Sequence, residues 1–218
     1  MIKKIRQIVK SILEEEGLPK DKIIIVDPAS LNQGEPSPAQ LPEGPSLIGL
    51  FSDVVDEKVA ELVHALLTLN EMNQELEEAK RKPIEFYLST YGGNADDMFA
   101  LYDVMREVRE GTEIHTVGSG KVMSAGVLLL AAGTKGKRRI GKNCRVMIHS
   151  VIAGNHGPLH NLINEMEAVE QIQKMYIDCL VAETELTKKQ LKKLLERKVN
   201  VYLSAEEAVE YGIADIII

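Results

Sequence analysis

A serine that follows a turn with two glycines, Gly118 and Gly120, is the first candidate for chemistry in this chain. Ser124 follows segment 118–123 and precedes a run of small and apolar residues that ends at Gly133. This pattern is typical of a short buried helix with Ser124 at its N-terminus and Gly133 just past its C-terminus. Unpaired N–H groups and the positive end of the helix dipole gather at a helix N-terminus, so Ser124 is suited to be a nucleophile that generates an oxyanion. An ordinary N-cap serine would occupy the same position, and the segment alone leaves both alternatives open.

A histidine at the end of an apolar strand is the second candidate. His149 closes segment 145–149, which has the residues of a buried strand. A neutral imidazole can take a proton from a hydroxyl, so His149 is a candidate general base, although a structural role fits the position too. The two cysteines, Cys144 and Cys179, have neither metal-ligand spacing nor the density of a disulfide scaffold. We therefore expect no metal site.

The elements that must position these residues predict an α/β fold. Three apolar strand patterns are each followed by residues with helical spacing, which favours a sheet of largely parallel strands. Ligands bind at the carboxyl ends of such strands, where the glycine turn 90–94 and the turn before Ser124 both lie. The expected strands are 47–51, 84–89 and 114–118; the helices that follow are expected to end by residues 82, 111 and 133, the first with a solvated tail at 71–82.

Further elements are expected after His149. A long helix from Leu159 to about Thr184 carries an apolar stripe that either packs on its own domain or marks a subunit contact. The remaining expectations are a helix at 186–197, a strand at 199–203, a helix after a capping box of Ser204 and Glu207, and a strand at 213–218.

Residues 1–46 differ from the rest of the chain. Segment 1–13 alternates basic and apolar residues, as an amphipathic surface or partner helix would, and segment 29–45 is rich in proline, glycine and serine. We expect an N-terminal appendage and Pro-rich linker over 1–46 and the main domain over 47–218. No apolar run approaches the roughly 20 residues of a membrane span.

The composition limits the classes of function. The 218 residues include 26 Lys and Arg against 33 Asp and Glu, a net charge of −7, so a non-specific nucleic-acid surface is not expected. A hydrophobic content of 44% with 27% charged residues is typical of a globular protein. The low cysteine count favours a reducing, cytoplasmic location.

Several blocks, in order along the chain, resemble the proteolytic subunit of the Clp protease, the ClpP family. The resemblance implies a ClpP/crotonase-like spiral of strand and helix units with a long protruding handle helix, and it covers residues 47–218. The blocks are 87–93, 120–126, 130–138, 147–149 and 203–215.

The resemblance also implies roles for individual residues. Ser124 would be the nucleophile and His149 the general base of a serine endopeptidase. The backbone N–H groups of Gly93 and Ala125 would form the oxyanion hole, with glycine at 93 letting the backbone approach the scissile carbonyl.

A substrate-binding role is implied for two further segments. The backbone of Gly120, Lys121, Val122 and Met123, and the loop after His149 with Val151, would hold the substrate as an added strand.

The third member of the triad departs from the family pattern. The position of the usual aspartate is Asn200, whose side-chain oxygen can orient the imidazole but offers no negative charge. Asp178 and Glu196 are less favoured substitutes.

An assembly is implied as well. The family forms stacked rings, here expected as two heptamers of this chain, with active sites in a chamber and the helix beginning at Leu159 as the ring-to-ring contact. No cofactor is expected, because ATP would be used only by a separate hexameric AAA+ unfoldase. Residues 1–46 and the tail 71–82 depart from the family pattern in the regions with which the family docks such an unfoldase.

Two alternatives stay open. A catalytically silent structural or regulatory ring subunit would explain Asn200 and Lys121, but not the intact pair of Ser124 and His149. An acyl-thioester enzyme of the crotonase fold would not need that pair.

Overall fold

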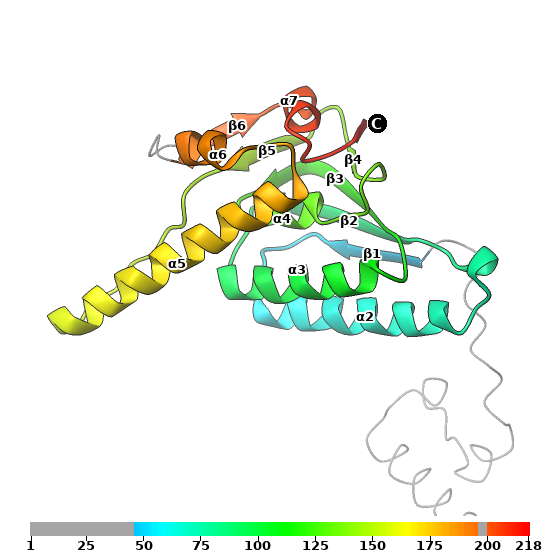
Figure 1. The fold of residues 1–218 in the computed structure, drawn as a ribbon, viewed down its shortest axis with the longest axis horizontal. Helices are drawn as coiled ribbons and strands as arrows, with labels where there is room; N and C mark the ends of the chain where they lie inside the picture. Colours follow the sequence, from blue (N-terminus) through cyan, green and yellow to red (C-terminus); the bar gives the residue numbers. More distant parts are fainter. Residues whose placement is uncertain (1–45, 196–199) are drawn as a thin grey trace, which may run out of the picture. The chain divides into compact units, whose positions relative to one another are not determined.

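The computed structural model describes residues 46–195 and 200–218 (Figure 1). The helix and linker expected within residues 1–45, and Glu196, lie outside the described residues. In chain order the elements are β1 (Ser46–Leu50), α2 (Asp56–Gln74), the 3₁₀ turn η3 (Glu78–Lys80), β2 (Ile84–Thr90), α3 (Ala95–Arg109), β3 (Ile114–Met123), α4 (Ala125–Ala131), β4 (Arg139–Ile140), β5 (Arg145–Ile148), α5 (Leu159–Glu183), α6 (Lys188–Leu195), β6 (Val201–Leu203), α7 (Ala205–Glu210) and β7 (Ile216–Ile217).

The described strands form one seven-stranded sheet, and the predicted α/β fold is confirmed. Strands β1, β2, β3, β4 and β7 pair in that order, all parallel. Strand β5 joins the far end of β3, and β6 is antiparallel to β5. Helices α2 and α3 lie side by side along the sheet (Figure 1). The carboxyl ends of β2, β3 and β5 therefore open toward one region of the molecule.

Strand β3 is longer than predicted, which corrects the expected end at Gly118. It runs to Met123, because its last three residues pair with β5 while its first part pairs with β2 and β4. Gly120 has a φ of 66°, and the register with β2 shifts between Leu88 and Thr90. The glycines bend the strand instead of ending it, because new backbone partners are available beyond the bend.

Helix α2 is shorter than predicted. It ends at Gln74, and the chain does not continue as a solvated helical tail to residue 82. The reason is Asn73, which is buried and whose amide donates to the Lys82 carbonyl at 2.7 Å and accepts from the Lys82 N–H at 3.2 Å. These two bonds fold the polar segment back toward β2.

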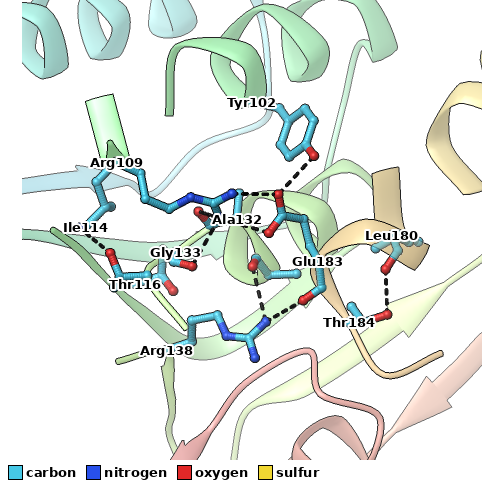
Figure 2. Close-up of polar contacts among 12 residues, drawn as sticks. Tyr102, Arg109, Ile114, Thr116, Ala132, Gly133, Arg138, Leu180, Glu183 and Thr184 are labelled. Atoms are coloured by element: carbon cyan, nitrogen blue, oxygen red, sulfur yellow. Dashed lines mark hydrogen bonds and ion pairs between the residues drawn. The ribbon is translucent and has the colours of Figure 1, made fainter. Parts of the chain in front are cut away.

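Helix α4 lies at the centre of the core, and all seven of its residues are buried. Buried carbonyls at a helix C-terminus need donors from elsewhere. Arg109 donates to the Ala132 carbonyl at 2.8 Å, and Arg138 donates to the Ala131 carbonyl at 3.2 Å (Figure 2). Two arginines from other elements thus satisfy the end of this short helix.

Both arginines are hydrogen-bonded to one buried glutamate, Glu183. Glu183, at the end of α5, is 3% exposed and accepts two hydrogen bonds from Arg109 at 2.9 Å and one from the Tyr102 hydroxyl at 3.0 Å (Figure 2). Its backbone carbonyl accepts from Arg138 at 2.7 Å. Burial alone would raise the pKa of Glu183, but the hydrogen bonds and charge of Arg109 outweigh it and hold the pKa below its ordinary value. The carboxylate is therefore ionised inside the core.

Helix α5 is the long protruding helix that was predicted. Its buried residues, Tyr176, Ile177, Leu180 and Glu183, all lie in its C-terminal part, and the N-terminal part extends past the sheet (Figure 1). The predicted capping box of α7 is also present, with Ser204 and Glu207 each bonding the other's backbone. None of the described helices has the length and apolar character needed to cross a membrane.

Replacing Glu183 by glutamine tests the buried network. The change leaves Arg109 without its carboxylate, so it should lower the free energy of unfolding by about 3 kcal/mol in urea titrations at pH 7. Glu167→Gln, at an exposed position of the same helix, should change it by less than about 0.5 kcal/mol. Equal losses in the two variants would contradict the role given to Glu183.

The same variant has a signature in pH. Because the pKa of Glu183 is lower in the folded than in the unfolded chain, its contribution to stability is present above the unfolded pKa of about 4.3 and is lost as pH falls through the folded pKa. The free energy of unfolding of Glu183→Gln should therefore decline less steeply than that of the parent below about pH 4.

Candidate active site

Ser124 sits in a strained turn between a strand and a helix. Its φ is 54° and its ψ is −121°, and it is the one non-glycine residue with positive φ among the described residues. Such a conformation costs on the order of 1–3 kcal/mol and persists only where the surroundings enforce it. Its side chain makes no capping hydrogen bond. The N-cap alternative therefore describes the position of Ser124 but not the use of its hydroxyl.

Both backbone groups of Ser124 are fixed by the surrounding structure. Its N–H donates to the Met147 carbonyl of β5 at 2.8 Å. Its carbonyl accepts from the Val127 N–H at 3.0 Å and from the Tyr176 hydroxyl of α5 at 3.0 Å. Strand β5 and helices α4 and α5 together hold the strained turn.

Two glycines at the end of β2 make room for this turn. A Cβ on Gly92, whose φ is 102°, would lie 2.6 Å from the Cβ of Ser124 and 2.9 Å from the Met123 carbonyl. A Cβ on Gly93 would lie 2.2 Å from the Val54 carbonyl. Glycine at 93 is thus required by the neighbouring backbone of Val54, a different reason from the approach to a scissile carbonyl that the sequence suggested.

The N–H groups of Gly93 and Ala125 both stand outside the regular hydrogen bonds of their neighbouring elements. Gly93 and Val54 form a bridge in which the Val54 N–H donates to Gly92 at 2.8 Å and the Asn94 N–H donates to Val54 at 2.9 Å. Because successive residues of an extended chain point their N–H groups to opposite sides, that of Gly93 points away from Val54. Ala125 is the first residue of α4, so its N–H has no partner within the helix.

His149 follows β5 directly and is half-buried. Its Nδ1 lies 2.6 Å from the Ser150 carbonyl oxygen. A carbonyl only accepts hydrogen bonds, so we assign the proton to Nδ1, and Nε2 of the neutral ring is then left as a proton acceptor. This is the tautomer that a general base needs.

One cavity of about 420 Å³ brings the main candidates together. Ser124, His149, Gly93, Ala125 and Val151, which come from three separate parts of the chain, all line it. The polar groups of the sequence-based candidate site therefore converge on a space of a size that can hold a substrate side chain.

Asn200 lies beside this site without contacting His149 through a hydrogen bond. It is exposed and does not line the cavity. The antiparallel register pairs Ile148 with Val201, and one step further along both strands Asn200 falls opposite His149. Among the described residues, the recorded partner of the His149 ring is Ser150, not Asn200. Asp178 is engaged elsewhere, with Lys188 at 2.5 Å.

The segment Gly120, Lys121, Val122 and Met123 is also outside the cavity. Its last three residues pair in register with Arg145, Val146 and Met147 of β5, and Val122 also pairs with Thr90 of β2. Val122 therefore has backbone partners on both sides, whereas Lys121 and Met123 pair with β5 alone, which limits the ability of this segment to pair with an added strand.

Several wall residues were not identified from the sequence as part of a site. They are Tyr91, Asn94, Ala95, Met98, Ser150, Ile152, Ile172 and Tyr176. Ile172 and Tyr176 are four positions apart on α5, so helical spacing places them on one face, but it does not show what that face covers. Residues 46–195 and 200–218 contain no group of three His, Cys, Asp or Glu side chains that could hold a metal ion.

Comparison with known proteins identifies relatives over most of the chain. The sequence model of the Clp protease family matches residues 46–218. ATP-dependent Clp protease proteolytic subunit 2 of Corynebacterium jeikeium is 30% identical over 207 residues, 93% of this chain and 94% of the relative. Subunit 1 of Corynebacterium glutamicum is 32% identical over 170 residues, 78% of this chain and 77% of the relative. The proteolytic subunit of Deinococcus radiodurans is 32% identical over 172 residues, 79% of each chain.

The contact between Gly92 and Ser124 can be tested by a matched pair of variants. Gly92→Ala combines a positive φ with a Cβ contact of 2.6 Å, whereas Gly136→Ala has a positive φ of 83° but no heavy atom within 4 Å of the new Cβ. We expect Gly136→Ala to lower the free energy of unfolding by about 1 kcal/mol and Gly92→Ala by at least about 3 kcal/mol. Urea unfolding at fixed protein concentration measures both, and equal losses would refute the close contact.

Proposed function

The chain belongs to the Clp protease family, and on that basis we propose that it is a serine endopeptidase subunit that cleaves unfolded polypeptides. In this proposal Ser124 is the nucleophile, His149 is the general base, and the N–H groups of Gly93 and Ala125 form the oxyanion hole. The observation that carries it is the shared cavity, which joins the strained Ser124 to His149 and to two outward N–H groups. The names of the relatives, proteolytic subunits of ATP-dependent Clp proteases, support the same reaction.

The proposed reaction follows from these positions. Ser124 Oγ attacks the scissile carbonyl while Nε2 of His149 takes its proton, and the resulting oxyanion accepts hydrogen bonds from Gly93 and Ala125. His149 then gives the proton to the leaving amine, and an acyl-enzyme remains. Water, deprotonated by His149, hydrolyses the acyl-enzyme and restores Ser124.

Asn200 completes the proposal as the third member of a Ser-His-Asn triad. Its side-chain oxygen would accept the Nδ1 proton that Ser150 accepts in the structure, which requires a small change at the end of β5. An amide orients the ring but carries no charge to stabilise the imidazolium, so Asn200 would be a weaker partner than an aspartate.

For the substrate we propose an extended polypeptide held beside the cavity. Val151 and Gly93 line the same cavity as Ser124 and His149, and both lie outside the strands of the sheet. Both segments suggested from the sequence have engaged backbone groups, since β3 pairs with β5 and the Val151 N–H donates to the Gln173 side chain at 2.7 Å. The loop after His149 is the better candidate because it lines the cavity.

We further propose that the chain assembles into two stacked heptameric rings through α5. Leu159, Ile163 and Met166 are large apolar residues exposed on its protruding part. Ile172, by contrast, lines the cavity, so the stripe divides into an exposed part and a part that packs on its own domain. An exposed apolar stripe of this kind is typical of a subunit contact.

We also propose a partner and a location for the peptidase. ATP would be hydrolysed by a separate hexameric AAA+ unfoldase, the peptidase itself would need no cofactor, and the cytoplasm would be its location. Relatives named as ATP-dependent support the first point.

A second candidate function is a catalytically silent ring subunit. The observation that favours it is the absence, among the described residues, of a hydrogen bond between Asn200 and His149. The strained Ser124, with its hydroxyl outside any capping bond, favours the peptidase over this alternative.

Labelling with a fluorophosphonate probe separates the two functions. The parent should be labelled, Ser124→Ala should not, and His149→Ala should be labelled about 10²–10⁴-fold more slowly because the general base is lost. Ser119→Ala, at an exposed position of β3, should be labelled at the parent rate. Labelling that survives Ser124→Ala would refute the proposed nucleophile, and a folded parent that resists labelling would favour the silent subunit.

Variants at Asn200 extend the same experiment to the third member. Asn200→Asp should be labelled about tenfold faster than the parent because a carboxylate stabilises the imidazolium, and Asn200→Ala more slowly. Parent rates in both variants would remove Asn200 from the triad.

The proposed role of α5 in assembly predicts the effect of a charge at Met166, which is 62% exposed. Met166→Glu should shift the protein from the assembled to a smaller species in size-exclusion chromatography, weakening association at least about tenfold through loss of apolar burial. Gln171→Glu adds the same charge on another face of the helix and should leave the assembly intact. An intact assembly in Met166→Glu would show that this stripe is not the contact.

A further inference from the structure

We infer that Tyr176 is a positioning residue that sets the direction of the Ala125 N–H in the oxyanion hole. The inference rests on the proposed function. Tyr176 lies on α5, is 5% exposed, and donates its hydroxyl proton to the Ser124 carbonyl at 3.0 Å. This contact joins residues that are 52 positions apart in the sequence.

The geometry of the peptide bond connects this contact to the oxyanion hole. The Ser124 carbonyl and the Ala125 N–H belong to the same peptide unit, which is planar and trans, so the two groups point in opposite directions. A donor that fixes the carbonyl on one side therefore fixes the N–H on the other. The hydroxyl of Tyr176 acts on the oxyanion through this unit without touching the substrate carbonyl.

The strain at Ser124 explains why a fixed peptide unit matters. A serine with a φ of 54° would lower its conformational energy by rotating toward an ordinary conformation. Such a rotation would turn the adjoining peptide unit. Besides Tyr176, the Ser124 carbonyl accepts only one further hydrogen bond within residues 46–195 and 200–218, from the Val127 N–H at 3.0 Å in the first turn of α4. In this part of the chain the tyrosine is therefore the hydrogen-bond donor that restrains the carbonyl from outside α4.

The surroundings of Tyr176 suit a permanent donor. Burial raises the pKa of its hydroxyl well above the ordinary value, so the proton stays in place throughout the range in which a histidine base works. The residue also lines the cavity beside Ser124. Phenylalanine would keep that wall and remove only the hydrogen bond.

The competing explanation is that the hydrogen bond of Tyr176 only stabilises the fold, by giving a buried hydroxyl an acceptor. Tyr102 provides a matched control. Tyr102 is 2% exposed, and its hydroxyl donates to Glu183 at 3.0 Å and not to a backbone group of Ser124. Tyr102→Phe removes a buried hydrogen bond of the same kind. Because Arg109 keeps its two hydrogen bonds to Glu183 in this variant, the end of α4 stays anchored, and the change should reduce stability but leave kcat of the folded protein unchanged.

The experiment compares Tyr176→Phe with Tyr102→Phe and the parent in peptide hydrolysis and in binding of a peptide boronate, whose tetrahedral adduct places an oxygen in the oxyanion hole. For Tyr176→Phe we expect kcat to fall about tenfold with KM unchanged, and boronate affinity to fall by a similar factor. Binding of an unreactive product peptide should not change. This split between kcat and KM would not arise from a loss of folding alone.

Three results would overturn the inference. The first is parent values of kcat and boronate affinity in Tyr176→Phe while Ser124 is labelled in the parent, which leaves the proposed function standing. The second is a parent that neither hydrolyses peptides nor reacts at Ser124, which removes the proposed function and this inference together. The third is a tenfold loss of kcat when 3-fluorotyrosine replaces tyrosine at position 176. This residue keeps the hydrogen-bond donor and should preserve kcat even if Tyr176→Phe folds poorly, so such a loss would exclude the hydrogen bond as the cause of a low kcat in Tyr176→Phe.

Discussion

Helix α5 holds both ends of α4, and the site depends on this arrangement. At the N-terminal end, Tyr176 donates to the Ser124 carbonyl; at the C-terminal end, Glu183 binds Arg109, which donates to the Ala132 carbonyl. A helix of seven buried residues is too short to fix itself, because its unpaired backbone groups outnumber its internal hydrogen bonds. The strained turn at Ser124 can persist because the helix that follows it cannot shift.

The proposed oxyanion hole consists of backbone N–H groups, and glycines determine how closely the chain segments that carry them approach one another. Gly92 and Gly93 bring the end of β2 against Ser124 and against Val54, closer than any side chain would allow. The Gly93 N–H points away from Val54, and the Ala125 N–H has no partner within α4. Family membership and this geometry support acyl transfer to a serine, with the charge of the intermediate held by amides instead of side chains.

Local patterns in the sequence were sufficient for the parallel α/β order, the long α5 and the capping box at Ser204, because each depends on neighbouring residues. They failed where distant partners decide the structure: β5 extends β3 past Gly118, and the Asn73 amide ends the helical tail. Glu183 could not be recognised as buried, since its arginine lies 74 positions away. The cavity walls from α5 were missed for the same reason, whereas Ser124 and His149 were candidates from their positions at the ends of strands, and a family resemblance gave them their expected roles.

The most direct measurement is a crystal structure of the assembled protein with a peptide boronate. We expect a covalent bond between boron and Ser124 Oγ, one boronate oxygen about 2.7–3.1 Å from both the Gly93 and Ala125 nitrogens, and His149 Nε2 beside the adduct. The Tyr176 hydroxyl should remain on the Ser124 carbonyl. An adduct at another residue, or a boronate oxygen directed away from these two amides, would show that Ser124 and these amides do not form the catalytic site.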